Sequence, residues 1–189
     1  DGITIRRIYD NGFDYEFIES AGEPYDDITV METYHALTDG ADEVTHLKRG
    51  DVITVCGLTL TVYNAWDETV LATVGEEKDY QNNASLLFKL AGAEKSMLFC
   101  SDIKYDMDAV LLETYADAIA CDYVQTGHHG NWSFSDAFYE KTGASVFFLD
   151  APSEITDGDF PAKALKEQLL GQKKTVLDFS TAPNTVTLR

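Results

Sequence analysis

The 189-residue chain is long enough for a domain with a sizeable core, and its 44% hydrophobic and 25% charged residues are ordinary globular usage. Its net charge is −19, from 33 acidic and 14 basic residues, and an acidic surface repels phosphate backbones. We therefore expect no extended nucleic-acid binding, and no membrane partner either, because no apolar run approaches the ~20 residues of a membrane helix.

The N-terminal part alternates short predicted elements with polar stretches. Residues 3–9 have a strand pattern that ends in a turn, residues 13–28 read as a loop, and residues 30–41 as a short helix. Threonines alternate with leucines and valines around Gly57, which predicts a pair of antiparallel strands over residues 52–63.

The middle of the chain continues the β pattern. Residues 64–83 are polar and irregular, and we expect a loop there with a short strand at 70–72. Two apolar runs, residues 84–90 and 96–100, are joined by a link of hairpin length. The first half therefore reads as an antiparallel meander.

After Asp102 the hydrophobic period changes and strands alternate with helices. Ser133 and Asp136 have capping-box spacing, which predicts that a helix starts at Ser133. The predicted helices are 105–117, 133–142 and 161–170, and the predicted strands are 119–126, 145–150, 174–179 and 185–188. We expect an α/β (α+β) protein with a helix-covered sheet, as a single domain over residues 1–189.

Two of the four histidines are adjacent and bracketed by glycines, at His128 and His129. Such glycines let a chain turn sharply at the open end of a strand, where functional side chains gather. The alternative is a polar turn whose imidazoles only cap the next helix. His35 and His46 are isolated, and we interpret both as ordinary surface or partly buried residues.

Asp102 follows an apolar strand, just as His128 does. Taken alone, Asp102 could be the N-cap of the next helix. Strands joined by a helix run parallel, so the two strand ends should lie on one rim of the sheet. A carboxylate beside a neutral imidazole is an environment for a divalent metal.

The three cysteines, Cys56, Cys100 and Cys121, sit singly, so a Cys-x-x-Cys zinc cluster is excluded. Their odd number favours a reducing compartment, which leans toward the cytoplasm.

Three segments in order carry a family resemblance: Gln81 to Leu90 with its Asn-x-x-Ser pattern, Leu98 to Asp102, and Val124 to Asn131 with its His-His-Gly turn. Together they resemble metallo-β-lactamase-fold hydrolases, and most closely the competence-protein branch linked to DNA uptake. The match covers roughly residues 50–150.

The resemblance implies an αββα sandwich of two β-sheets with outer helices, and a site for two divalent metal ions, commonly zinc. Asp102 would bridge the metals, and His128 would bind one of them. His129 would either support His128 or be the ligand in its place. Neighbouring residues at a strand end point opposite ways, so we expect only one of the two to bind, and we favour His128.

The sequence departs from the family in several places. Ser101 stands where a glycine is usual before the Asp, and Asn131 stands where the turn has Ser. The family hallmark, a His-x-His-x-Asp-His segment that supplies most metal ligands, does not occur in the sequence. We therefore expect a metallo-β-lactamase-like sandwich that lacks its N-terminal strands.

The resemblance and these departures lead to two alternative hypotheses for the function. The complete protein would be a metal-dependent hydrolase of a small-molecule or phosphodiester substrate, with a phosphate ester as the favoured class. Alternatively, the chain is a catalytically incomplete or degenerate domain that serves as a binding or assembly module. In either case we expect it to associate with the missing N-terminal segment or with itself, because an uncovered sheet seeks a partner.

Overall fold

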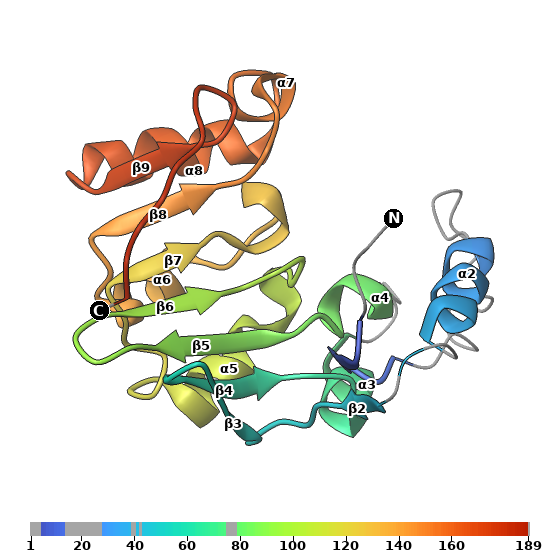
Figure 1. Cartoon of the computed structure of the whole chain (residues 1–189). Helices are drawn as coiled ribbons and strands as arrows, with labels where there is room; N and C mark the ends of the chain where they lie inside the picture. The colour runs from blue at the N-terminus through green and yellow to red at the C-terminus, as the bar shows by residue number, and fades with distance from the viewer. Residues whose placement is uncertain (1–4, 14–27, 39–40, 42, 75–78, 189) are drawn as a thin grey trace.

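The computed structural model describes residues 5–13, 28–38, 41, 43–74 and 79–188. The fold is mixed α/β, and its centre is a seven-stranded sheet with the strands in chain order from β3 to β9 (Figure 1). The strands are β3 (Val52–Val55), β4 (Leu58–Asn64), β5 (Leu87–Ala91), β6 (Ser96–Phe99), β7 (Tyr123–Gln125), β8 (Val146–Leu149) and β9 (Thr175–Asp178). Strands β1 (Arg7–Asp10) and β2 (Glu43–His46) pair in parallel as a separate two-stranded sheet.

The helices are α2 (Ile28–Thr38), α3 (Glu68–Val74), α4 (Tyr80–Asn83), α5 (Asp108–Tyr115), α6 (Asp136–Thr142), α7 (Ser153–Thr156) and α8 (Pro161–Gly171). Two short 3-10 turns are η2 (Tyr105–Met107) and η3 (Gly127–Gly130). None of the helices in the described ranges is long and apolar enough to cross a lipid bilayer.

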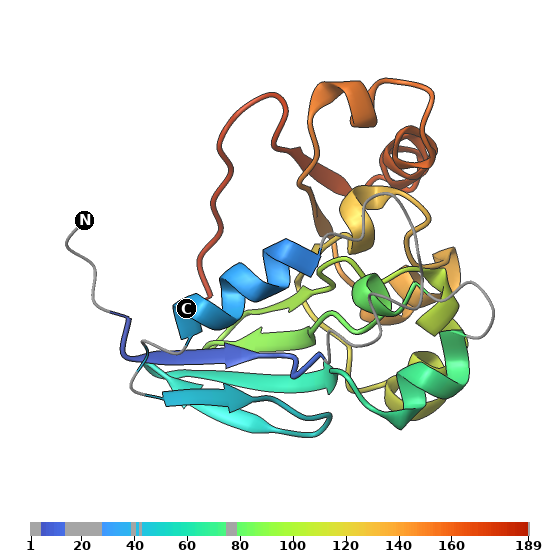
Figure 2. The same cartoon turned by 90° about the vertical axis from the view of Figure 1, so that its right-hand side faces the viewer.

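The sheet changes character at β6. Neighbouring strands from β3 to β6 are antiparallel, and those from β6 to β9 are parallel. This confirms the predicted meander followed by β–α alternation. The carboxyl ends of β6 and β7 consequently lie on the same edge of the sheet, which faces the viewer in Figure 2.

The two faces of the sheet are covered differently. Helices α3, α5, α6 and α8 lie on one face, and the C-terminal segment crosses the other (Figure 2). The helix-covered face holds the main core, where Leu98, Val124 and Phe147 are fully buried. The C-terminal segment passes so close to the β5–β6 hairpin that a side chain at Gly92 would overlap the Leu188 carbonyl.

Several predicted elements are wrong. Residues 64–83 contain α3 and α4 instead of a strand at 70–72, and residues 185–188 form no strand. Helix α6 starts later than predicted, because Ser135 is its N-cap and accepts a hydrogen bond from the Phe138 N–H at 3.3 Å. The expected loop at 13–28 falls mostly on residues 14–27, outside the described residues, and α2 already begins at residue 28.

Candidate metal site

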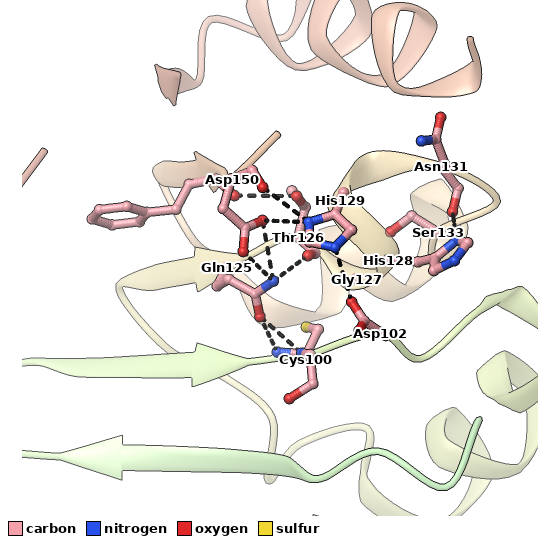
Figure 3. A network of polar contacts seen from close by, with 12 residues as sticks. Cys100, Asp102, Gln125, Thr126, Gly127, His128, His129, Asn131, Ser133 and Asp150 are labelled. Carbon is pink, nitrogen blue, oxygen red and sulfur yellow. Dashed lines mark hydrogen bonds and ion pairs between the residues drawn. The ribbon is translucent and has the colours of Figure 1, made fainter. Parts of the chain in front are cut away.

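The candidate site lies where β6 and β7 end side by side (Figure 3). Asp102 belongs to the turn after β6, and His128 and His129 belong to η3, which follows β7. The sequence therefore predicted the rim correctly: parallel pairing brings both loops to one edge.

The two loops are tied to each other through their backbones. The His128 N–H donates to the Ser101 carbonyl at 2.9 Å. Gly127 packs so closely on the neighbouring loop that a Cβ there would come within 2.6 Å of the Ile103 carbonyl oxygen. Glycine is therefore required at this point, because any other side chain would push the loops apart.

The backbone of the rim is strained. Six non-glycine residues in the described ranges have positive φ, and four of them lie here: Ser101 (48°), His128 (45°), His129 (56°) and Trp132 (42°). A non-glycine residue in the left-handed region costs about 1–3 kcal/mol and persists only where surrounding contacts enforce it. Such strain concentrates at functional sites, which makes this rim the strongest candidate in the described chain.

His129 is the imidazole that faces Asp102. Its Nε2 lies 3.4 Å from Asp102 Oδ1, and both side chains are about half exposed. Its Nδ1 lies 2.9 Å from the main-chain oxygen of Asp150. A carbonyl can only accept, so this contact places the neutral ring's proton on Nδ1 and leaves the Nε2 lone pair directed toward Asp102.

His128 turns away from this contact (Figure 3). Its Nδ1 pairs with the Asn131 carbonyl at 2.7 Å, and its ring lies beside Trp132, with centroids 6.1 Å apart. The preference for His128 as the ligand rested on the alternation of a strand. In the structure both histidines sit in a left-handed turn, and it is His129 that the turn directs toward Asp102.

Gln125 joins the parts of the site. Its Oε1 accepts hydrogen bonds from the N–H groups of Cys100 (2.9 Å) and Ser101 (2.8 Å), in the turn that leads to Asp102. Its Nε2 donates to the Thr126 carbonyl at 2.6 Å and to both carboxylate oxygens of Asp150, at 3.2 and 3.3 Å.

A cavity of about 610 Å³ opens beside these groups on the sheet face opposite the main helices. Its polar end is formed by Asp102, Gln125 and Asp150, and the C-terminal segment closes one side. The rest of the lining is mainly apolar: Met97, Phe99, Phe148, Phe179 and Val186.

The donor set fits one edge of a metal site but does not complete it. Two ligand atoms bound tetrahedrally at about 2.1 Å lie about 3.4 Å apart, which matches the Nε2–Oδ1 separation of Asp102 and His129. Within the described residues, however, no three His, Cys, Asp or Glu side chains are grouped to hold a metal. The nearby Cys100 side chain is buried in the main core, and this burial raises the pKa of its thiol well above the usual value.

Sequence reasoning missed Gln125 and Asp150. Asp150 follows the apolar strand β8 just as Asp102 follows β6, so the same pattern was present a third time along the chain. Gln125 is the last residue of β7, where alternation with the buried Val124 allows a polar side chain, so nothing in the sequence indicated its role. The Asp150 signal was readable once the ends of the parallel strands were considered together.

No family model matches this sequence, and a search of curated proteins found no match.

Proposed function

We propose that the chain supplies the Asp102–His129 part of a divalent-metal site in a hydrolase with a metallo-β-lactamase-like αββα fold. The observation that carries the proposal is the 3.4 Å separation between His129 Nε2 and Asp102 Oδ1. That distance is long for an N–H···O hydrogen bond, and it equals the spacing of two ligands on one tetrahedral ion.

The surroundings support the same assignment. Metal-binding histidines nearly always donate their second ring N–H to a carbonyl or carboxylate, as His129 can to Asp150. The proposed metal is zinc or a similar divalent ion. A catalytic zinc needs about three protein ligands and a water, so the remaining ligands would come from outside the described residues.

We favour a phosphate ester, such as a small phosphodiester, as the substrate. A bound divalent ion supplies positive charge and lowers the pKa of bound water. The chain's own residues would hold the ligand pair in place, and the cavity beside Asp102 would receive an apolar part of the substrate. The net charge of −19 disfavours a long nucleic acid.

The second candidate is a binding or assembly module, and two observations favour it. The described residues offer no third metal ligand. The edge strand β3 also exposes apolar side chains, with Val52 62% and Val55 44% exposed, and such edges pair with other chains. Size-exclusion chromatography with light scattering should then show a concentration-dependent dimer, whereas a monomer at all concentrations would contradict self-association.

The metal proposal is tested by titrating the chain with Zn²⁺ and with Co²⁺, whose absorption reports ligand number. We expect weak binding that His129→Gln or Asp102→Asn reduces by about tenfold or more, because each removes one of only two ligands. His128→Gln is the matched control and should bind as the wild type does. Equal losses in His128→Gln and His129→Gln would overturn the assignment, and no binding at all would favour the module.

A further inference from the structure

The side-chain amide of Gln125 uses its full hydrogen-bonding capacity. The oxygen accepts from two backbone N–H groups, and the NH₂ group donates to a carbonyl and to a carboxylate. The two N–H donors fix which end of the amide is oxygen, because a flipped amide would place NH₂ against them.

The acceptor end holds the turn before Asp102. Ser101 has a φ of 48°, and its N–H donates to Gln125 Oε1 at 2.8 Å. The Ser101 hydroxyl donates to the Leu86 carbonyl at 2.8 Å, and the main-chain carbonyl of Ser101 accepts from the His128 N–H. Gln125 therefore helps to enforce the strained conformation from which Asp102 projects.

The donor end holds the other side of the site. Gln125 Nε2 lies 3.2 and 3.3 Å from the two carboxylate oxygens of Asp150. The same Asp150 presents its main-chain oxygen to His129 Nδ1, and its Oδ1 lies 3.9 Å from that nitrogen. Restraining Asp150 thus restrains the ring orientation and tautomer of His129.

Of the side chains of similar length, only glutamine serves both ends. Glutamate keeps the acceptor but would place a second carboxylate against that of Asp150. The repulsion between the two carboxylates would displace Asp150. Lysine keeps a donor for Asp150 but cannot accept from the N–H groups of Cys100 and Ser101. The two halves of the interaction can therefore be removed one at a time.

We infer that Gln125 is a positioning residue that aligns Asp102 and His129 simultaneously, one through each end of its amide. For its consequence in metal binding the inference rests on the proposed function. The alignment itself does not, because the hydrogen bonds are made within the chain.

The test compares wild type with Gln125→Glu, Gln125→Lys and Gln125→Leu by two NMR measurements. Hydrogen exchange of the Ser101 amide reports the acceptor end, and the ring ¹⁵N shifts of neutral His129 report the tautomer. We expect Gln125→Glu to keep Ser101 protected and lose the fixed Nδ1–H tautomer. Gln125→Lys should keep the Nδ1–H tautomer of His129 and lose the protection of Ser101. Gln125→Leu should lose both the protection and the fixed tautomer. Thermal unfolding shows which variants are folded. If Gln125→Leu does not fold, the comparison of Gln125→Glu with Gln125→Lys still tests the positioning role.

A Zn²⁺ titration of the same variants separates this inference from the proposed function. We expect each folded variant to bind about tenfold more weakly or worse, the usual effect of removing a group that orients a ligand. If wild type binds no Zn²⁺, the proposed function fails, while the NMR measurements still judge Gln125. If wild type binds and every variant keeps its tautomer, its Ser101 protection and its affinity, the positioning role is refuted.

Discussion

Two polar clusters at strand ends differ in how their backbones are built. The first joins Arg49 to Asp67, with Nε–Oδ2 and Nη2–Oδ1 distances of 2.8 and 3.2 Å. Arg49 also donates to the Tyr63 carbonyl and to Asn64, at 2.7 and 2.9 Å. Its left-handed position is a glycine, Gly50, with φ 92°.

The second cluster is the rim of Asp102 and His129, and it differs from the first in three ways. Its carboxylates lie against His129, whereas the carboxylate of the first cluster lies against an arginine. The side chains of Asp102 and His129 are about half exposed, and the left-handed positions of the rim carry serine, histidine and tryptophan. A cluster that only stabilises a fold can use glycine where the backbone requires it. The rim instead holds serine, histidine and tryptophan in left-handed conformations, and strain of this kind is concentrated at functional sites in proteins generally.

The largest expected effect separates the two clusters. Arg49→Met should lower the free energy of unfolding by about 2–3 kcal/mol, because it leaves the partly buried Asp67 carboxylate without its cation and the Asn64 side-chain oxygen without its donor. Urea unfolding measures the loss, and Arg49→Lys should recover only part of it. The ring shifts of His129 should not change. A shift there would show that the two clusters are coupled.

The acid dependence of stability sharpens the contrast. Burial opposes ionisation of Asp67, but the hydrogen bonds and charge of Arg49 outweigh it and lower the Asp67 pKa. A depressed folded-state pKa stabilises the fold above the unfolded pKa of about 3.9, and that stabilisation is lost as pH falls through the folded value. Urea unfolding across the acid range should therefore show the wild type converging on Asp67→Asn. Parallel curves throughout would contradict the assignment.

An intermediate effect is expected where the rim meets α8. Asn131 is 8% exposed, and its Oδ1 accepts from the Ala162 N–H at 3.2 Å in the first turn of that helix. Asn131→Ala should cost about 1 kcal/mol, as the loss of a helix cap does. Asn131→Asp retains the acceptor and serves as the control in thermal unfolding. Equal losses in both variants would mean that the cap contributes little.

The smallest effect on stability should come from the residue that matters most for the proposed function. Asp102→Asn removes a half-exposed charge, so its unfolding free energy should change by less than about 0.5 kcal/mol. Chemical unfolding of the metal-free chain tests this. A large loss would assign Asp102 a structural role instead.

Much of the fold was predictable because its signals are local. Alternation around Gly57 predicted the β3–β4 pair, and Pro161 at a helix start predicted α8. Helix α3 was missed because its surroundings are polar. Its signal was nevertheless present, since Asp67 Oδ1 accepts from the N–H groups of Thr69 and Val70, as an N-cap does.

The site was predictable only as far as the rim. Parallel strand ends place Asp102 near the histidines, and that argument needs no side-chain detail. The choice between His128 and His129 depends on two successive left-handed residues, and the sequence pattern gives no sign of that conformation. Gln125 needed the three-dimensional arrangement, because its partners are 24 and 25 residues away in the chain.

The change of direction at β6 also has a consequence for how the molecule folds. The β5–β6 connection spans only residues 92–95, whereas the crossover from β6 to β7 spans residues 100–122. Closing a short hairpin costs less chain entropy than closing a long crossover, so the meander should form early and the parallel half late. The rim sits on the boundary between them. Its strained loops would be assembled only in the last stages of folding, when both halves are in place to hold them.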